Sequence, residues 1–233
     1  MKISIHQPDY VPYIGYFYKM WQSDVFVFLD DVQFSNDNMH NWNRVKTPQG
    51  ECRLKIPVDY KFGNSINLVR PRDELKWKEK HLKTIEANYA RAKYFKEYYP
   101  KFKDVVLGCY PNLAEMNIAI NSYIATCFGI KPKVCRTSMM NISSVREERV
   151  IDICSMLGGK TYISGNGARA YQVEDHFVQR GLRLQYTEYR AVKYSQLWGD
   201  FLPNMSIIDY IFNCGYEWDI IIKALDYQSE IKG

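Results

Sequence analysis

Apolar residues near the start of the chain fall into two short runs separated by a polar loop. Residues 2–6 form an apolar-rich segment, and residues 25–29 read Val-Phe-Val-Phe-Leu without interruption. A continuous β-branched and aromatic run is typical of a strand buried on both faces. Residues 16–21 between the two runs fit a short helix. The order strand, loop, helix, strand predicts the beginning of a parallel α/β sheet.

The remaining pattern continues the alternation of helices and strands. Ser144 and Glu147 are spaced as a capping box, which predicts a helix from there to residue 157. No linker or repeat interrupts the chain, so the sequence predicts a single α/β domain over residues 1–233 with a mainly parallel sheet flanked by helices and a helical segment at about 74–128. Further strands are expected at 52–58, 133–138, 160–163 and 182–189, and helices at 74–106, 112–128, 169–177, 206–215 and 217–230.

Composition adds one unusual feature, an excess of aromatic residues. The chain has 19 Tyr, 11 Phe and 5 Trp among 233 residues. Tyrosine combines an apolar ring with a polar hydroxyl and is therefore suited to pocket walls. The six cysteines are scattered without a CxxC pair, so we expect no metal site.

The net charge is +5, and no apolar run reaches the roughly 20 residues that span a bilayer. The first residues do not resemble a signal peptide, which favours a cytoplasmic protein. A mild positive charge suits an enzyme of phosphorylated metabolites, but it equally suits a solvated helix face. Without an accompanying nucleic-acid-binding signature, the charge does not favour nucleic acid as a partner.

A glycine-containing turn, Ser164 to Arg169, lies between an expected strand and an expected helix. Gly165 and Gly167 would let backbone amides approach an anion, with Ser164, Asn166 and Arg169 completing a phosphate cradle. An ordinary strand-to-helix turn is the alternative, because Gly and Asn are its usual residues.

Two other segments follow predicted strands at the carboxyl edge of the sheet, where α/β proteins bind ligands. The loop after residue 5 offers His6 as a proton carrier, and it brings Gln7, Tyr10, Tyr13, Gly15 and Tyr16 with it. Asp30 ends the second strand and could hold Mg²⁺, or it could simply terminate that strand. Residues 41–47 place Asn43 on one face and Arg44 with Lys46 on the other, which suits a phosphate or, alternatively, a solvated edge strand.

These segments together resemble the WbqC-like protein family. The resemblance rests on His6-Gln7-Pro8, residues 13–16 and 24–33, Asn41 to Thr47 with 56–58, residues 162–168, and residues 202–209 with Asn213 and Gly215. It covers nearly the whole chain, with the blocks in the family order. The family is associated with bacterial O-antigen and other surface-polysaccharide gene clusters.

A weaker likeness is to nucleotidyltransferases of the HxGH type, which implies a Rossmann-like, nucleotidyltransferase-like fold. Residues 163–169 look like the second motif of that class, with Arg169 at the matching offset. Residues 13–16 look like its first motif, with Tyr13 and Tyr16 in place of both histidines. ATP with Mg²⁺ is the cofactor that this likeness suggests.

The sequence therefore predicts a cytoplasmic enzyme that transfers or ligates an acyl, aminoacyl or nucleotidyl group on a nucleotide-linked or phosphorylated amino sugar. His6, Asp30 and Arg44 are the expected catalytic residues, and Tyr189 joins the tyrosines expected to line the substrate pocket. The alternative is a non-catalytic nucleotide-sugar-binding protein that retains a degenerate pocket. A homodimer is left open.

Overall fold

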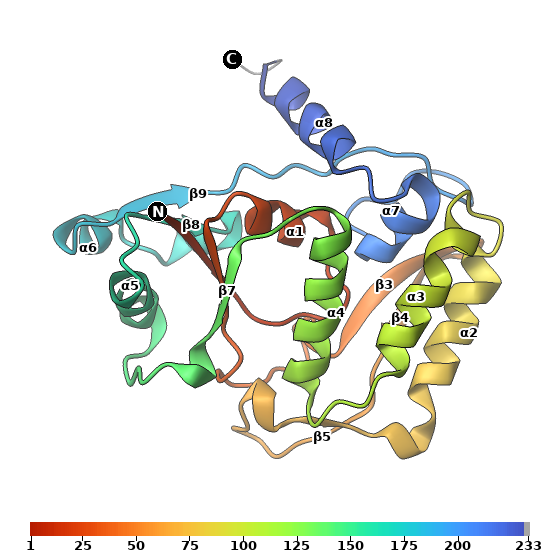
Figure 1. Cartoon of the computed structure of the whole chain (residues 1–233), viewed down its shortest axis with the longest axis horizontal. Helices are drawn as coiled ribbons and strands as arrows, with labels where there is room; N and C mark the ends of the chain where they lie inside the picture. The colour runs from red at the N-terminus through yellow and green to blue at the C-terminus, as the bar shows by residue number, and fades with distance from the viewer. Residues whose placement is uncertain (231–233) are drawn as a thin grey trace.

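Five parallel strands form the central sheet of the protein (Figure 1). The computed structural model describes residues 1–230, and side chains are described through residue 226. The strand order is β7-β2-β1-β8-β9, and every neighbouring pair is parallel. The predicted parallel α/β fold is confirmed. The strands are β1 (Lys2–His6), β2 (Val25–Phe28), β7 (Lys133–Arg136), β8 (Thr161–Ser164) and β9 (Arg183–Tyr186).

The strand order reverses direction between β1 and β8. From β1 the chain builds outward through β2 to β7, then crosses back to β8 and continues outward to β9 on the other side. In open parallel sheets the connections leave a crevice outside the carboxyl ends of the strands at this reversal. Here those carboxyl ends are His6 and Ser164.

The continuous apolar run of β2 supplies both faces of the sheet. Phe26 and Phe28 pack into the larger core, whereas Val25 and Val27 pack into the smaller one. Helices α1 (Ile14–Trp21) and α4 (Leu113–Cys127) contribute to the larger core, and α5 (Arg146–Met156) and α6 (Glu174–Gln179) cover the opposite face (Figure 1). All four β2 residues are buried, as the pattern predicts.

A second layer extends the larger core. The hairpin β3 (Trp42–Thr47) and β4 (Gly50–Lys55) is antiparallel and separate from the main sheet, so the expected strand 52–58 pairs locally. The expected helix 74–106 is two helices, α2 (Trp77–Tyr89) and α3 (Phe95–Leu107). They are separated where the Tyr94 amide turns to donate to the Phe212 carbonyl at 3.0 Å. The other elements of this layer are β5 (Val58–Asp59), β6 (Arg70–Pro71), α7 (Ile207–Cys214) and α8 (Trp218–Glu230).

The predicted capping box is wrong. Helix α5 begins at Arg146 behind Val145, and no side chain caps it. The Glu147 carboxylate instead accepts a hydrogen bond from the Val173 amide at 2.9 Å and contacts His176 at 2.6 Å. The expected helix 169–177 is consequently displaced. A 3₁₀ helix covers Asn166–Ala170, and α6 starts only at Glu174, directly after Val173, whose amide donates to the Glu147 carboxylate.

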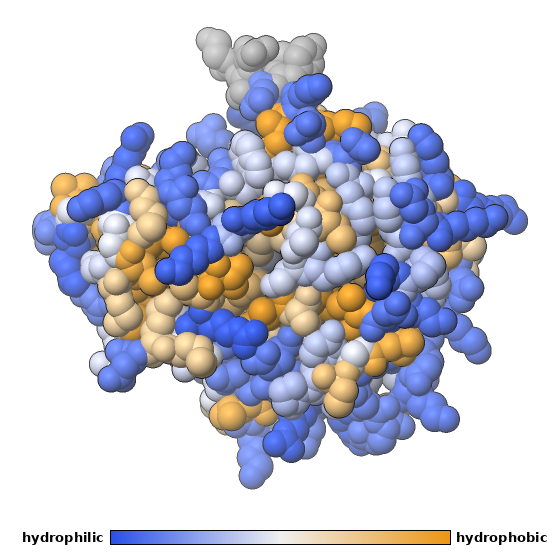
Figure 2. All heavy atoms as spheres, viewed as in Figure 1, coloured by the Kyte–Doolittle hydropathy of each residue, from blue (hydrophilic) through white to orange (hydrophobic). Residues whose placement is uncertain are grey.

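Apolar side chains also reach the surface over β7, the edge strand, and beside α5 (Figure 2). Val134 and Met156 are among those exposed there. Within residues 1–230, no helix combines the length and apolar character needed to cross a membrane.

The loop that follows β1 is buried and held by side-chain amides. Asn117 on α4 donates to the carbonyls of Pro8 (2.8 Å) and His40 (2.7 Å). Asn43 on β3 donates to the Tyr10 carbonyl at 2.9 Å, and it also reaches Val11 at 3.0 Å. Since buried carbonyls need donors, these amides determine the path of the chain between the first strand and α1.

Replacement of Asn117 tests this role. Asn117→Ala leaves two buried carbonyls without their donor and should lower the free energy of unfolding by about 2 kcal/mol or more. Urea denaturation measures the change. Asn88→Ala is the matched control, because that amide donates only to the Thr84 carbonyl within α2 and its loss should change stability by less than about 0.5 kcal/mol. Equal effects of the two substitutions would contradict the role of Asn117.

Candidate functional site

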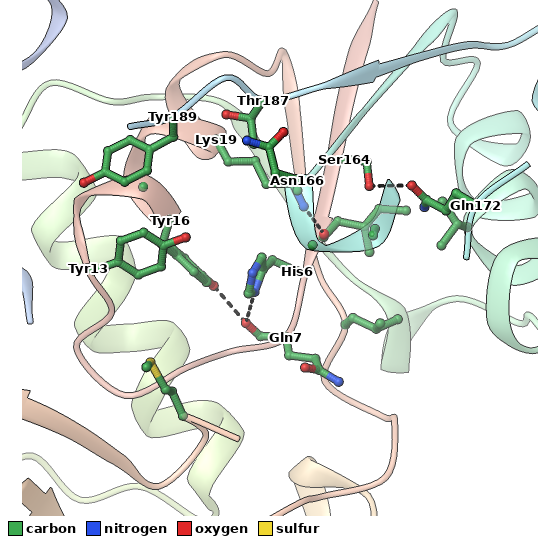
Figure 3. Close-up of a pocket in the computed structure, with 18 of the residues that line it drawn as sticks. His6, Gln7, Tyr13, Tyr16, Lys19, Ser164, Asn166, Gln172, Thr187 and Tyr189 are labelled. Atoms are coloured by element: carbon green, nitrogen blue, oxygen red, sulfur yellow. Dashed lines mark hydrogen bonds between the residues drawn. The ribbon is translucent and has the colours of Figure 1, made fainter. Parts of the chain in front are cut away.

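A cavity of about 1150 Å³ opens at the carboxyl ends of β1 and β8, where the strand order reverses (Figure 3). Most of the residues predicted from sequence line it, although they come from segments more than 150 positions apart. The predicted residues that the structure brings together are His6, Gln7, Tyr13, Gly15, Tyr16, Arg44, Ser164, Gly165, Asn166, Gly167 and Tyr189.

Three predicted binding residues are structural instead and do not line the cavity. Tyr10 is fully buried, and its hydroxyl bonds to His81 at 3.1 Å. The Asn43 side-chain amide donates to the loop carbonyls of Tyr10 and Val11. Lys46 is buried, with its ammonium bonded to Gln196 and to the Asp200 carbonyl. Arg44 therefore lines the cavity, whereas Lys46 bonds to groups outside the cavity lining.

Asp30 also lies outside the cavity lining. Its carboxylate accepts hydrogen bonds from the Ser138 amide (2.9 Å) and hydroxyl (2.6 Å), which tie the end of β2 to the end of β7. The strand-terminating alternative therefore describes this residue. Among the described residues, no group of three or more His, Cys, Asp or Glu side chains is placed to hold a metal ion.

The glycine turn lines the cavity, but Arg169 does not. The Arg169 guanidinium lies over the Tyr186 ring, 4.4 Å from its centre. The Ala168 amide is used within the turn, donating to the Gly165 carbonyl at 3.0 Å. The space beside Gly165 and Gly167 is open, since a Cβ at either would meet no atom within 4 Å. The turn predicted as a phosphate cradle therefore lines one side of the cavity, with open space beside its glycines, but Arg169 does not take part.

Tyrosines form another wall, as the aromatic excess suggested. The rings of Tyr13 and Tyr189 meet edge to face, 5.5 Å apart. Gly15 makes this contact possible, because a Cβ there would lie 2.3 Å from the Tyr13 ring and 2.7 Å from the Tyr189 ring. The glycine of the Tyr-Ile-Gly-Tyr motif is therefore explained by close packing of two cavity-lining rings.

His6 is held in one tautomer. Its Nδ1 lies 3.0 Å from the Gln7 carbonyl, which can only accept, so Nδ1 carries the proton and Nε2 is an acceptor. The Tyr16 hydroxyl donates to the same carbonyl at 3.1 Å, and the two rings are in edge contact at 4.6 Å. Burial and the nearby Lys19 ammonium lower the pKa of His6 to about 3. The imidazole is therefore neutral at pH 7, and it becomes an effective base only where a neighbouring negative charge raises this pKa.

Asp9 lies behind His6 and was missed by the sequence reasoning. Its carboxylate is 3.8 Å from His6 Nδ1 and 4.0 Å from His40 Nε2. Burial raises the pKa of Asp9 to about 7 and lowers that of His40 to about 4. His40 Nε2 also lies 3.2 Å from the side-chain oxygen Oε1 of Gln7. A histidine and an aspartate three positions apart are a recognisable sequence signal, but only the fold adds the second histidine.

The side of the cavity formed by β8 and the segment after β9 is polar. Ser164 donates to Gln172 at 2.7 Å. Thr187 is only 6% exposed, and its hydroxyl has no hydrogen-bond partner in the described part of the chain. Thr187, Gln172 and Asn204 line the cavity and carry no local sequence signal. Lys19 was also missed, although it is the only charge in an otherwise apolar helix.

A parallel α/β fold with a ligand-sized cavity at the strand-order reversal is the class of structure defined so far. The chain belongs to the WbqC-like protein family, which it matches over residues 7–219. The uncharacterized protein Rv1507c of Mycobacterium tuberculosis is 31% identical over 220 residues, which cover 93% of this chain and 95% of that protein. No solved structure matches the chain. The family resemblance inferred from the sequence motifs is confirmed.

The lowered pKa values predict acid sensitivity. His6, His40 and His81 have pKa values of about 3, 4 and 4, below the ordinary 6.5, whereas Asp9 is raised from 3.8 to about 7. Between about pH 4 and 6.5 the unfolded chain therefore binds up to three more protons on these histidines, and the folded chain binds one more on Asp9. The balance favours the unfolded state, so stability falls as the pH falls through this range.

His6→Gln should make this loss of stability shallower, because glutamine removes one of the three titrations and keeps hydrogen-bonding capacity. The urea midpoint measured at pH 7 and pH 5 for both proteins checks this expectation. The same difference between the two pH values in wild type and variant would show that His6 is not held neutral by burial.

Proposed function

We propose that the protein is a cytoplasmic enzyme of bacterial surface-polysaccharide synthesis, of the O-antigen type. Its substrate would be a nucleotide-linked or phosphorylated amino sugar, on which it transfers or ligates an acyl, aminoacyl or nucleotidyl group. The family's association with such gene clusters supports the pathway. The observation that carries the substrate class is the cavity of about 1150 Å³ at the strand-order reversal, where α/β proteins bind nucleotides.

The cavity chemistry suits such a substrate. The edge-to-face pair of Tyr13 and Tyr189 offers apolar ring surface to a base or sugar. Arg44, Lys19 and Arg146 bring cationic side chains to the lining, and Glu147 brings a carboxylate. The Thr187 hydroxyl has no partner in the described part of the chain, and a sugar or base would supply one. The volume exceeds that of typical drug-sized pockets, which leaves room for a nucleotide sugar.

His6 is the proposed general base. With the substrate's anionic group beside it to raise its pKa from about 3, its Nε2 lone pair would take the proton from the attacking amine or hydroxyl. The Gln7 carbonyl keeps the ring in the required tautomer. Arg44 is held by Glu51 through hydrogen bonds of 2.9 and 3.0 Å. This ion pair fixes the position of the Arg44 guanidinium at the cavity wall. Catalysis would then rest on positioning and electrostatic stabilisation.

A non-catalytic nucleotide-sugar-binding protein is the second candidate. Tyr13 and Tyr16 occupy the positions of the two motif histidines, and the Tyr16 hydroxyl is committed to the Gln7 carbonyl. Tyrosine cannot supply the positive charge that a protonated histidine brings to a transferring phosphate. Binding without turnover would favour this candidate.

Ligand-induced stabilisation tests the proposal. UDP-, dTDP- and GDP-sugars are compared with ATP, CTP and acyl-CoA in a thermal-shift assay. A bound ligand at 100 times its Kd adds about 2.7 kcal/mol, and each kcal/mol raises the Tm of a chain of this size by about 2 to 4 °C. At least one nucleotide or nucleotide sugar should raise the Tm, and no shift with any member of the panel would refute the proposed substrate class.

Thr187→Val tests whether the cavity is where that ligand binds. Valine keeps the shape and removes the unpartnered hydroxyl, so the unliganded protein should be as stable as wild type or more stable. Ligand affinity should fall by about tenfold, the equivalent of one lost hydrogen bond. Thr161→Val, on β8 but outside the cavity lining, is the control for titration calorimetry. An unchanged Kd in Thr187→Val would place the ligand elsewhere.

A further inference from the structure

Lys19 is a buried cation without an anion beside it. Its side chain comes from α1, is 5% exposed and lines the cavity. Nζ donates one hydrogen bond, to the Ile5 carbonyl at 2.8 Å, and no carboxylate within the described residues lies within ion-pair distance of it. Since an ammonium has three donors, this group has capacity for a further partner.

The groups facing Lys19 do not compensate its charge. The Tyr162 ring from β8 is centred 6.0 Å from Nζ, and Cys154 from α5 and His6 from β1 interact with it electrostatically. Burial raises the pKa of the Cys154 thiol to about 12, so the thiol is neutral, as is the His6 imidazole. Burial also lowers the pKa of Lys19 to about 7, as expected of a cation removed from water without a counter-ion.

Lys46, the other buried lysine among the described side chains, shows what a compensated ammonium looks like in this fold. Lys46 is 2% exposed, but its Nζ bonds to Gln196 at 3.1 Å and to the Asp200 carbonyl. The Asp209 carboxylate also interacts with it electrostatically. Lys46 lies outside the cavity lining, whereas the uncompensated Lys19 lies within it. An isolated buried charge is costly to maintain, and a charge in a binding site gains its partner from the ligand.

We propose that Lys19 is the binding position for the anionic group of the ligand, a phosphate or diphosphate, at the carboxyl end of β1. This rests on the proposed function and refines it, because it orients the substrate within the cavity. The charged end lies against Lys19 and His6, and the uncharged part extends toward Tyr13 and Tyr189 (Figure 3). In this orientation the turn from Ser164 to Gly167, from which Arg169 points away, contacts the ligand without contributing a charged side chain.

The arrangement couples ligand binding to proton uptake. Near pH 7 only part of the empty protein carries a protonated Lys19, and an anion favours the protonated form. Affinity for an anion should therefore fall as the pH rises above 7, by up to about tenfold per unit. Asp9, which lies beyond His6, ionises in the same range and weakens anion binding in the same direction. Removal of Lys19 separates the two contributions.

Lys19→Met is the decisive variant, tested by calorimetric titration from pH 6 to pH 9. UDP-glucose is one probe, because its diphosphate diester keeps its charge over this range, and inorganic sulfate is the other. At pH 6 the variant should bind UDP-glucose about thirtyfold more weakly or worse, as when one partner of a buried charge pair is removed. Its pH dependence should be shallower than that of wild type, and Lys19→Arg should retain most of the affinity.

Thermal stability supplies a readout that a purely structural lysine would not give. Removing an uncompensated buried charge should leave the Tm of Lys19→Met unchanged or raise it, and more at pH 6 than at pH 9, where the wild-type ammonium is already largely neutral. Lys46→Met is the matched control and should lower the Tm, because it leaves the Asp200 carbonyl without this donor and removes one of the two donors to Gln196 Oε1, the other being the Leu202 amide.

The outcomes separate this inference from the proposed function. Unchanged affinity of Lys19→Met for UDP-glucose would overturn the role of Lys19 and leave the nucleotide-sugar proposal intact. A Tm loss comparable with that of Lys46→Met would also overturn it, since Lys19 would then be structural. If no nucleotide sugar binds but sulfate binds wild type and not Lys19→Met, the inference stands and the proposed substrate class fails.

Discussion

Four consecutive backbone carbonyls, Pro8 to Val11, are directed into the protein interior, and each must find a donor there. Their donors are side chains from distant segments, and the shape of the cavity depends on these hydrogen bonds. Val11 has φ 37°, a left-handed conformation that is costly for a β-branched residue and is kept only where its surroundings enforce it. The donors are fully buried and comprise Asn117 and Asn121 from α4, Asn43 from β3 and Ser206 at the start of α7.

This network explains why the long insertion between β2 and β7 matters to the cavity. The strand reversal positions His6 and Ser164, but the loop from Gln7 to Tyr13 would have no determined path without α4 and β3. The elements that look peripheral in sequence therefore hold one wall of the cavity. Tyr13, Gly15 and Tyr189 then pack against one another on that wall.

Electrostatics inside the cavity follows from burial without charge pairing. His6 and Lys19 lose protons more readily than in water, while Asp9 retains one. Desolvation is the largest cause of all three shifts, so each disfavours the charged form. These three groups together therefore carry little net charge at pH 7. An anionic ligand would favour the protonated form of Lys19.

The sequence by itself determined the parallel α/β fold and the family, and most of the site residues that it predicted line the cavity. Local periodicity identifies the strands, as the apolar run of β2 illustrates. Because parallel strands bring their carboxyl ends to one edge of the sheet, the residues directly after the strands are brought together there. Tertiary structure alone decided which polar residues face the cavity. The Glu147 carboxylate accepts a hydrogen bond from the Val173 amide beside α6 instead of capping α5. The Arg169 guanidinium lies over the Tyr186 ring, and Lys46 and Asp30 bond to partners outside the cavity. The physical reason is that a polar side chain goes to whichever partner satisfies it, and those partners are distant in sequence.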